Sequence, residues 1–396
     1  MFERQRAQLR IESNTLSAPD APGRRSLLPT PDSVLGPADQ RPHARPRRST
    51  LRLLFTELGV RFSLLFPGSP WRDPNLYGHQ LVGDDFWILA GRWDSYTRKV
   101  DPARIHPRLG WTQGPLTTDN PLGLVRWTCE RLRRDGRRKI LFLGDSYVAG
   151  QAREEHWLPQ LLEERLRKAD VDVDVLHLGV GGYGADQMHL LLRETMPLVD
   201  RPELVLMGVM TFSFDRAAQR VRSYQKPVLA FGADGSMRVT NVPIWRSPKL
   251  YFALQRPSFA SYVARARRHD PRALAASHYE FDAKTGLNRA IIAANRQFAA
   301  KHGVPLVYVL FRDHEQLHRP DRRDRFWAEE LAAQGVTAFD TATPLLEHAR
   351  EHGTDGSELY ANGHLNERGN AVVTAALTIE LERLGLARTH RAKVLR

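Results

Sequence analysis

The sequence predicts a three-layer α/β/α sandwich with a parallel sheet, and two observations support this. From about residue 138 onward, short apolar runs alternate with longer segments in which apolar residues recur at helical spacing. Strands separated by such helices pair in parallel through right-handed crossovers, which places helices on both faces of the sheet. The chain has 396 residues, 42% of them hydrophobic, which is enough to bury a sizeable core.

The elements follow one another in a regular order. The apolar runs predict strands at residues 139–144, 171–179, 203–210, 304–311 and 336–339. The helical periodicity predicts helices at about 155–167, 186–194, 285–301, 323–334 and 366–384.

Residues 215–283 do not fit this alternation and are predicted to form an insertion. Within it, residues 224–244 resemble two strands joined by an Ala-Asp-Gly-Ser turn, which is a β-hairpin pattern. Loops beyond the carboxyl ends of parallel strands carry the ligand site in doubly wound folds. The hairpin is therefore either a lid or substrate wall, or a decoration without such a role.

The remaining segments differ in composition. Residues 1–49 are rich in Arg, Pro and Ser without apolar periodicity, and we expect them to be disordered. Residues 50–135 are expected to form a flanking or cap region. Its apolar segment 52–66 is either a membrane-surface helix or, as its few cations favour, a helix that packs on the main domain. The main domain itself spans 136–388, and 389–396 is a basic tail.

Composition excludes several classes of protein. The net charge is +13, but only eight of the 58 basic residues are lysines and the arginines are spread along the chain, so a nucleic-acid role is not favoured. No apolar run reaches the roughly 20 residues of a transmembrane helix. A single cysteine permits no internal disulfide and no thiolate zinc site. No signal-peptide pattern is present, so a cytoplasmic location is expected.

Two strand ends carry groups suited to acyl chemistry. Ser146 follows the first strand in GDSY (144–147), where a base can activate its hydroxyl; the alternative is the start of a helix. The second strand ends in GVGGYG (179–184), whose glycines bring backbone N–H groups close to a ligand, as an oxyanion site requires. The alternative there is a tight turn between strand and helix.

His364 is the preferred base among the 15 histidines. It lies in NGHLNERGN (362–370), a Gly-rich loop just before the last helix, which is expected at the same sheet edge as Ser146. His314 and His318 follow the fourth strand and are weaker candidates, and His348 and His352 belong to a polar helix.

These three blocks, GDSY, LGVGGYGADQ (178–187) and NGHLNERGN, resemble the SGNH, or GDSL-type, hydrolase family over about residues 138–386. The resemblance implies a flavodoxin-like fold and esterase, lipase or carbohydrate deacetylase activity without a metal or cofactor. It assigns Ser146 as the nucleophile and one oxyanion donor, Gly182 as a second donor, and His364 as the general base.

Two positions depart from the family pattern. Ser213 falls nearest the position of the family's oxyanion Asn, and a hydroxyl can replace one donor. Asn362 stands where an Asp usually orients the histidine. An Asn aligns the ring without negative charge, so a Ser-His dyad is expected unless Asp355, Glu358 or a backbone carbonyl serves instead.

The leading hypothesis is a serine hydrolase acting on a small-molecule or carbohydrate acyl ester. Two alternatives remain. An O-acyltransferase would pass the same acyl group to an alcohol instead of water, and a binding or scaffold domain would keep the pocket without catalysis.

Overall fold

The structure is a computed structural model. It describes residues 48–63, 101–127, 129–134, 136–220, 222, 224–232, 234–245 and 271–386. The predicted tails therefore lie outside the described residues, except for the two residues that begin the first helix. No helix within the described ranges is long and apolar enough to cross a bilayer.

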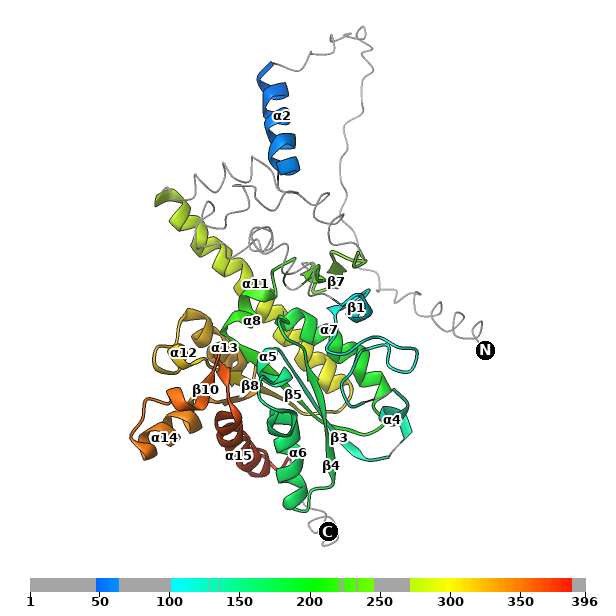
Figure 1. The fold of residues 1–396 in the computed structure, drawn as a ribbon, viewed down its shortest axis with the longest axis vertical. Helices are drawn as coiled ribbons and strands as arrows, with labels where there is room; N and C mark the ends of the chain where they lie inside the picture. Colours follow the sequence, from blue (N-terminus) through cyan, green and yellow to red (C-terminus); the bar gives the residue numbers. More distant parts are fainter. Residues whose placement is uncertain are drawn as a thin grey trace, which may run out of the picture. The chain divides into compact units, whose positions relative to one another are not determined.

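Five parallel strands form the main sheet of the described chain. They are β3 (Arg138–Gly144), β4 (Val173–Gly179), β5 (Pro202–Met210), β8 (Leu306–Phe311) and β9 (Thr337–Asp340). Their order is β4-β3-β5-β8-β9, which is 2-1-3-4-5 in chain order, the flavodoxin-like arrangement. Figure 1 shows β3, β4 and β5 side by side. The strand order reverses between β3 and β5, and ligands bind at such a switch point.

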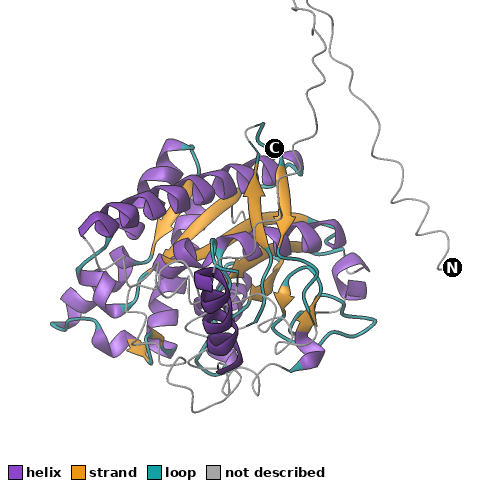
Figure 2. Ribbon diagram, turned by 90° about the horizontal axis from the view of Figure 1, so that it is seen from above, coloured by secondary structure: helices purple, strands orange, loops and turns teal. Residues whose placement is uncertain are grey.

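Helices cover both faces of this sheet, as Figure 2 shows. One face packs on α7 (Ala185–Thr195), α11 (Pro271–Lys301) and α13 (Arg322–Ala333). The other packs on α6 (Leu158–Lys168), α14 (Ala342–His352) and α15 (Glu367–Arg383). Leu141 and Leu143 belong to the first core, whereas Ile140 and Phe142 belong to the second, because alternate strand residues point to opposite faces. The predicted three-layer α/β/α sandwich is confirmed.

Shorter elements complete the described chain. The flank contains the 16-residue helix α2 (Arg48–Ser63), and the short helices are α4 (Cys129–Arg134), α5 (Ser146–Ala149), α8 (Thr211–Arg216) and α12 (His314–His318). Three antiparallel pairs join β1 (Ile105–His106) with β2 (Gly110–Trp111), β6 (Val228–Phe231) with β7 (Met237–Thr240), and β10 (Tyr360–Ala361) with β11 (His364–Leu365). The pair β6–β7 is the hairpin expected in the insertion.

Two predicted helices differ from the observed ones. The helix expected at 285–301 begins at Pro271, because the Ala-rich stretch after this proline favours helix and continues it across Gly286. The apolar helix of the flank is α2, but Leu54, Phe55 and Leu58 are each more than half exposed. The predicted packing on the main domain is therefore not found for these side chains.

Candidate active site

The first strand delivers Ser146 to the carboxyl edge of the sheet. Ser146 is the first residue of α5, and the Asp145 carboxylate caps this helix by accepting a hydrogen bond from the Tyr147 N–H at 3.0 Å. The Ser146 side chain is half-buried at the point where the strand order reverses. A substrate at the switch point of the fold therefore meets this hydroxyl.

Three glycines let α5 approach the sheet. Gly179 and Gly208 both pair with Gly144 in the register of the neighbouring strands, so the three glycines form one row. A Cβ at Gly144 or Gly208 would collide with the Val148 side chain, and one at Gly179 would collide with the backbone of α5. The row thus provides the space that the helix of Ser146 occupies.

His364 is presented by a hairpin rather than by an irregular loop. β10 and β11 pair through Ala361 and His364, with Asn362 and Gly363 as the two turn residues. Both turn residues have positive φ, +51° and +74°, as a type I′ turn requires. An Asn-Gly pair is a strong sequence signal for this turn, and the sequence prediction of a Gly-rich loop missed it.

The hairpin brings the imidazole to the serine. His364 Nε2 lies 2.8 Å from Ser146 Oγ, and His364 Nδ1 lies 3.0 Å from the backbone carbonyl oxygen of Asn362. A carbonyl oxygen only accepts, so Nδ1 carries the proton and Nε2 offers its lone pair to the hydroxyl. This is the geometry of a serine and its general base.

The histidine is oriented by a peptide group and not by an acid. Within the described residues, no hydrogen bond or ion pair joins His364 to a carboxylate, and the Asn362 side chain is exposed. The Asp355 carboxylate accepts from the Ser357 N–H at 2.9 Å, and the Glu358 carboxylate accepts from the Thr354 hydroxyl at 2.7 Å. Of the orienting groups considered from sequence, the backbone carbonyl is the one in contact.

Tyr147 connects the serine helix to the histidine hairpin, a role that sequence reasoning missed. Its ring lies 5.1 Å from the His364 ring, and its hydroxyl lies 3.0 Å from the carbonyl oxygen of Gly363 and 3.3 Å from that of Arg312. Burial raises the pKa of Tyr147, so the phenol stays protonated and donates. Its position directly after the serine was the available signal.

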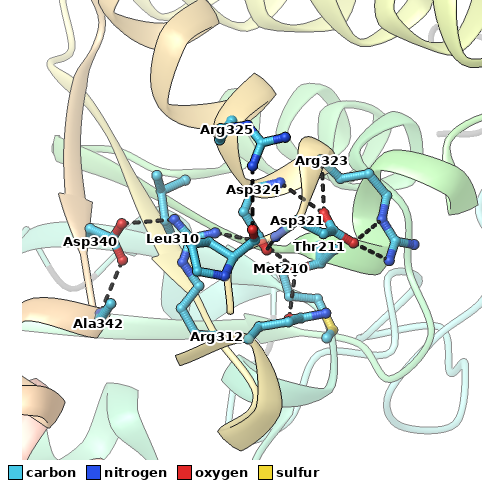
Figure 3. A network of polar contacts seen from close by, with 12 residues as sticks. Met210, Thr211, Leu310, Arg312, Asp321, Arg323, Asp324, Arg325, Asp340 and Ala342 are labelled. Atoms are coloured by element: carbon cyan, nitrogen blue, oxygen red, sulfur yellow. Dashed lines mark hydrogen bonds and ion pairs between the residues drawn. The ribbon is translucent and has the colours of Figure 1, made fainter. Parts of the chain in front are cut away.

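The Arg312 side chain belongs to a polar network at the ends of β5, β8 and β9 (Figure 3). The Arg312 guanidinium forms ion pairs with Asp324 and, at 2.7 Å, with Asp340. The Thr211 hydroxyl, at the start of α8, also bonds Asp324. The network therefore holds the end of β8, where the Tyr147 ring stacks on Phe311 at 5.2 Å between centroids.

Beneath the serine lies a buried ion pair between Asp145 and Arg216, 2.8 Å apart, with side chains 0% and 9% exposed. Ser213 is fully buried beside it. The Ser213 hydroxyl oxygen lies 3.2 Å from the Met210 N–H, which donates to it, and 3.5 Å from the Asp145 carboxylate. The structure thus directs this hydroxyl toward Asp145, and its suggested role as an oxyanion donor stays a prediction.

The two oxyanion donors predicted from the family resemblance are the backbone N–H groups of Ser146 and Gly182. Ser146 opens α5, so its N–H has no acceptor within the helix. Gly182 lies in the turn from Val180 to Tyr183, which is closed by the Tyr183 N–H on the Val180 carbonyl at 3.2 Å. In the described part of the chain, neither the Ser146 nor the Gly182 N–H has an acceptor.

The other histidines have different surroundings. His318 Nε2 contacts the Asp355 carbonyl at 2.7 Å, and His314 lies 3.7 Å from the Asp355 carboxylate. His348 and His352 stack on each other along α14. Among the described residues, no group of three His, Cys, Asp or Glu side chains is arranged to hold a metal ion.

The chain is therefore a doubly wound α/β protein with a serine–histidine pair at the switch point of its sheet. No family model and no curated protein matches it. Solved structures do match it, and two of them are described as lipolytic proteins of the G-D-S-L family, the family that the three sequence blocks resemble.

A lipase/acylhydrolase from Enterococcus faecalis is 15% identical, with a TM-score of 0.35 over 62% of this chain and 95% of that one. A lipolytic G-D-S-L protein from Veillonella parvula is 12% identical, with a TM-score of 0.37 over 62% and 99%. A two-domain esterase active on acetylated mannans is 12% identical, with a TM-score of 0.36, and this chain spans 49% of its length.

Proposed function

We propose that this protein is a serine-dependent acyl-ester hydrolase. The observation that carries the proposal is the 2.8 Å contact between Ser146 Oγ and His364 Nε2 at the carboxyl edge of the sheet. A hydroxyl at this distance from an imidazole with a free lone pair is the arrangement that turns serine into a nucleophile.

The proposed reaction has two halves. Ser146 Oγ attacks the ester carbonyl carbon while His364 Nε2 takes the hydroxyl proton, and the Ser146 and Gly182 N–H groups bind the resulting oxyanion. The tetrahedral intermediate then expels the alcohol, which receives the proton from His364. Water, deprotonated by His364, attacks the acyl-serine, and the carboxylic acid leaves as Ser146 regains its proton.

The absence of a carboxylate beside His364 in the described residues limits the expected rate. The Asn362 carbonyl holds the ring in the correct tautomer, but a neutral dipole stabilises the imidazolium less than an anion does. We expect turnover below that of enzymes with a full triad. Acyl esters of small molecules and of carbohydrates are the proposed substrate class.

The test compares wild type with Ser146→Ala on p-nitrophenyl esters of increasing acyl length and on acetylated sugars. Wild type should hydrolyse at least one of them, and the variant should lose about a thousandfold or more in kcat. A fluorophosphonate should label wild type at Ser146, located by mass spectrometry, and should leave Ser357 unlabelled. Equal rates in wild type and Ser146→Ala would reject the nucleophile, and an unlabelled, inactive wild type would favour a binding domain.

A further inference from the structure

The peptide between Gly181 and Gly182 sits in a turn with two possible forms. Gly182 has φ of +84°, and Gly181 is not among the residues with positive φ, which together define a type II turn from Val180 to Tyr183. A type I turn closes the same hydrogen bond with this middle peptide rotated by about 180°. Because both central residues are glycine, neither form is excluded sterically.

The orientation of this peptide decides where the Gly182 N–H points. In a trans peptide, the Gly181 carbonyl and the Gly182 N–H project from opposite edges of one plane. A rotation that converts type II into type I therefore reverses both groups. If the N–H faces the substrate in one form, it faces away in the other.

Trp111 holds the carbonyl edge of this peptide. Its indole Nε1–H donates to the Gly181 carbonyl oxygen at 3.0 Å, across 70 residues of sequence. The Trp111 side chain is only 7% exposed, and its ring packs edge-on against Tyr183 with centroids 5.5 Å apart. The Tyr183 hydroxyl in turn donates to the Trp111 carbonyl, so the two aromatic residues lock one another.

The strand that carries Trp111 is itself anchored to the same part of the fold. The Gln187 side chain, on α7, donates to the Leu109 carbonyl at 2.8 Å. A Cβ on Gly110 would collide with the Gln225 carbonyl of the insertion. The indole is thus delivered to the turn by a packed segment, although Gly181 itself is exposed.

We propose that Trp111 is a positioning residue that keeps the Gly181–Gly182 peptide in its type II form and so presents the Gly182 N–H to the oxyanion. The inference rests on the proposed acyl-transfer function. The indole bond also polarises the peptide, which makes the N–H on its far edge a stronger donor. This gives the N-terminal flank, whose sequence shows no chemistry of its own, a part in catalysis.

The test is Trp111→Phe in the full chain, which keeps an aromatic ring and removes the donor. We expect kcat on a p-nitrophenyl ester to fall about tenfold, less than the hundred- to thousandfold of losing an oxyanion donor outright. KM should stay within about twofold, because the ground-state ester carries no oxyanion. The rate of fluorophosphonate labelling should fall in parallel with kcat. The acidic midpoint of the pH–rate profile should not move, since His364 keeps its contacts.

Trp157→Phe is the matched control. The Trp157 indole also donates to a backbone carbonyl, that of Ala152 at 2.9 Å, which is not part of the oxyanion turn. This variant should lose a similar amount of thermal stability and keep its kcat within about twofold. If Trp111→Phe misfolds, replacing Trp111 with benzothienylalanine keeps the ring shape and removes only the N–H.

The outcomes separate this proposal from the proposed function. An active wild type whose kcat and labelling rate are unchanged by the loss of the Trp111 donor overturns the role of Trp111. Equal losses of kcat in the Trp111 and Trp157 variants also overturn it, because they indicate general destabilisation. A wild type that neither turns over esters nor reacts with the fluorophosphonate instead rejects the hydrolase on which the inference rests.

Discussion

Two turns carry the groups proposed to act with Ser146, and they are held in different ways. The proposed oxyanion turn, from Val180 to Tyr183, is fixed by a tryptophan and a tyrosine that are 7% and 0% exposed. The base turn, at Asn362 and Gly363, is exposed, and its fixed contact with the described core is the Tyr147 hydroxyl on the Gly363 carbonyl. One turn is framed by buried side chains, whereas the other depends on its own backbone preference.

This difference shows what Asn362 contributes to the site. From sequence, this residue is a weak substitute for the acid of a triad. In the structure its φ is +51°, a left-handed conformation that Asn adopts more readily than most residues, and its carbonyl rather than its side chain meets His364. The residue shapes the hairpin that delivers the imidazole.

Removing the base is expected to have the largest effect. His364→Ala deletes the proton acceptor 2.8 Å from Ser146 Oγ and should lower kcat by about a hundred- to ten-thousandfold. The measurement is ester turnover with active-site titration. His318→Ala, which removes a histidine bonded to a distant carbonyl, should remain near wild type. The reverse pattern, a large loss in His318→Ala and none in His364→Ala, would show that His364 is not the base.

The second-largest effect is expected at Gly182, in the proposed oxyanion turn. Gly182→Ala places a Cβ at φ of +84°, which costs about 1–2 kcal/mol and favours the type I form that turns the N–H away. We expect kcat to fall about ten- to a hundredfold. Gly303→Ala is the control, because Gly303 has φ of +66° and no atom near an added Cβ. It should be destabilised by a similar amount and leave kcat unchanged. Equal kcat values for both variants would contradict the role of Gly182.

The segment that carries Trp111 should also be acid-sensitive. His106 Nδ1 accepts hydrogen bonds from the Arg108 and Leu109 N–H groups, and burial, followed by the Arg108 charge, lowers its pKa to about 4. The unfolded chain binds this proton near pH 6.5, so the stability that neutral His106 contributes is present above pH 6.5 and lost as pH falls toward 4.

Between pH 7.5 and pH 5, His106 is expected to lower the free energy of unfolding by about 2 kcal/mol. Burial lowers the pKa of His177 and His189 to about 4 as well, so wild type should lose stability overall in this range. His106→Asn retains an acceptor that does not titrate, and urea unfolding at the two pH values should show a smaller loss than wild type. Identical losses would mean that His106 is not held neutral.

The smallest effect is expected at Asn362→Asp. An Asp-Gly pair also forms a type I′ turn, so the hairpin should persist. The His364 Nδ1 proton is already donated to the backbone at 3.0 Å, and the new carboxylate would start from an exposed side chain. We expect kcat to change by less than about tenfold, against the roughly 10⁴-fold contribution of a buried triad Asp. A larger gain would show that the side chain can replace the carbonyl.

The strands of the sheet could be predicted from the sequence, but the segments that connect them could be predicted only in part. Apolar runs located all five strands within a few residues. The signal is strongest in β3, β5 and β8, because buried parallel strands are apolar along most of their length, whereas β9 is partly exposed. The early start of α11 was missed, since an Ala-rich segment after a proline carries no apolar period from which to read a helix.

The candidate site divides in the same way. Ser146 and His364 follow from their places at strand ends and in a Gly-rich block, and the structure brings them together. The bond from Trp111 to Gly181 joins residues 70 positions apart and leaves no local pattern. The hairpin at residues 362 and 363 does have a local signal, because an Asn-Gly pair favours a type I′ turn through its backbone rather than through the Asn side chain.

The glycine row formed by Gly179, Gly144 and Gly208 sets how deep the nucleophile sits. At Gly179 the obstacle to a methyl group is main chain, which has no rotamer to change, so even alanine would lift α5 away from the strands. The distance between the Ser146 hydroxyl and the His364 imidazole thus depends on three strand positions that have only a hydrogen atom as side chain. Moving the serine–histidine pair onto another parallel sheet would therefore require glycines at these three strand positions as well as the reactive side chains.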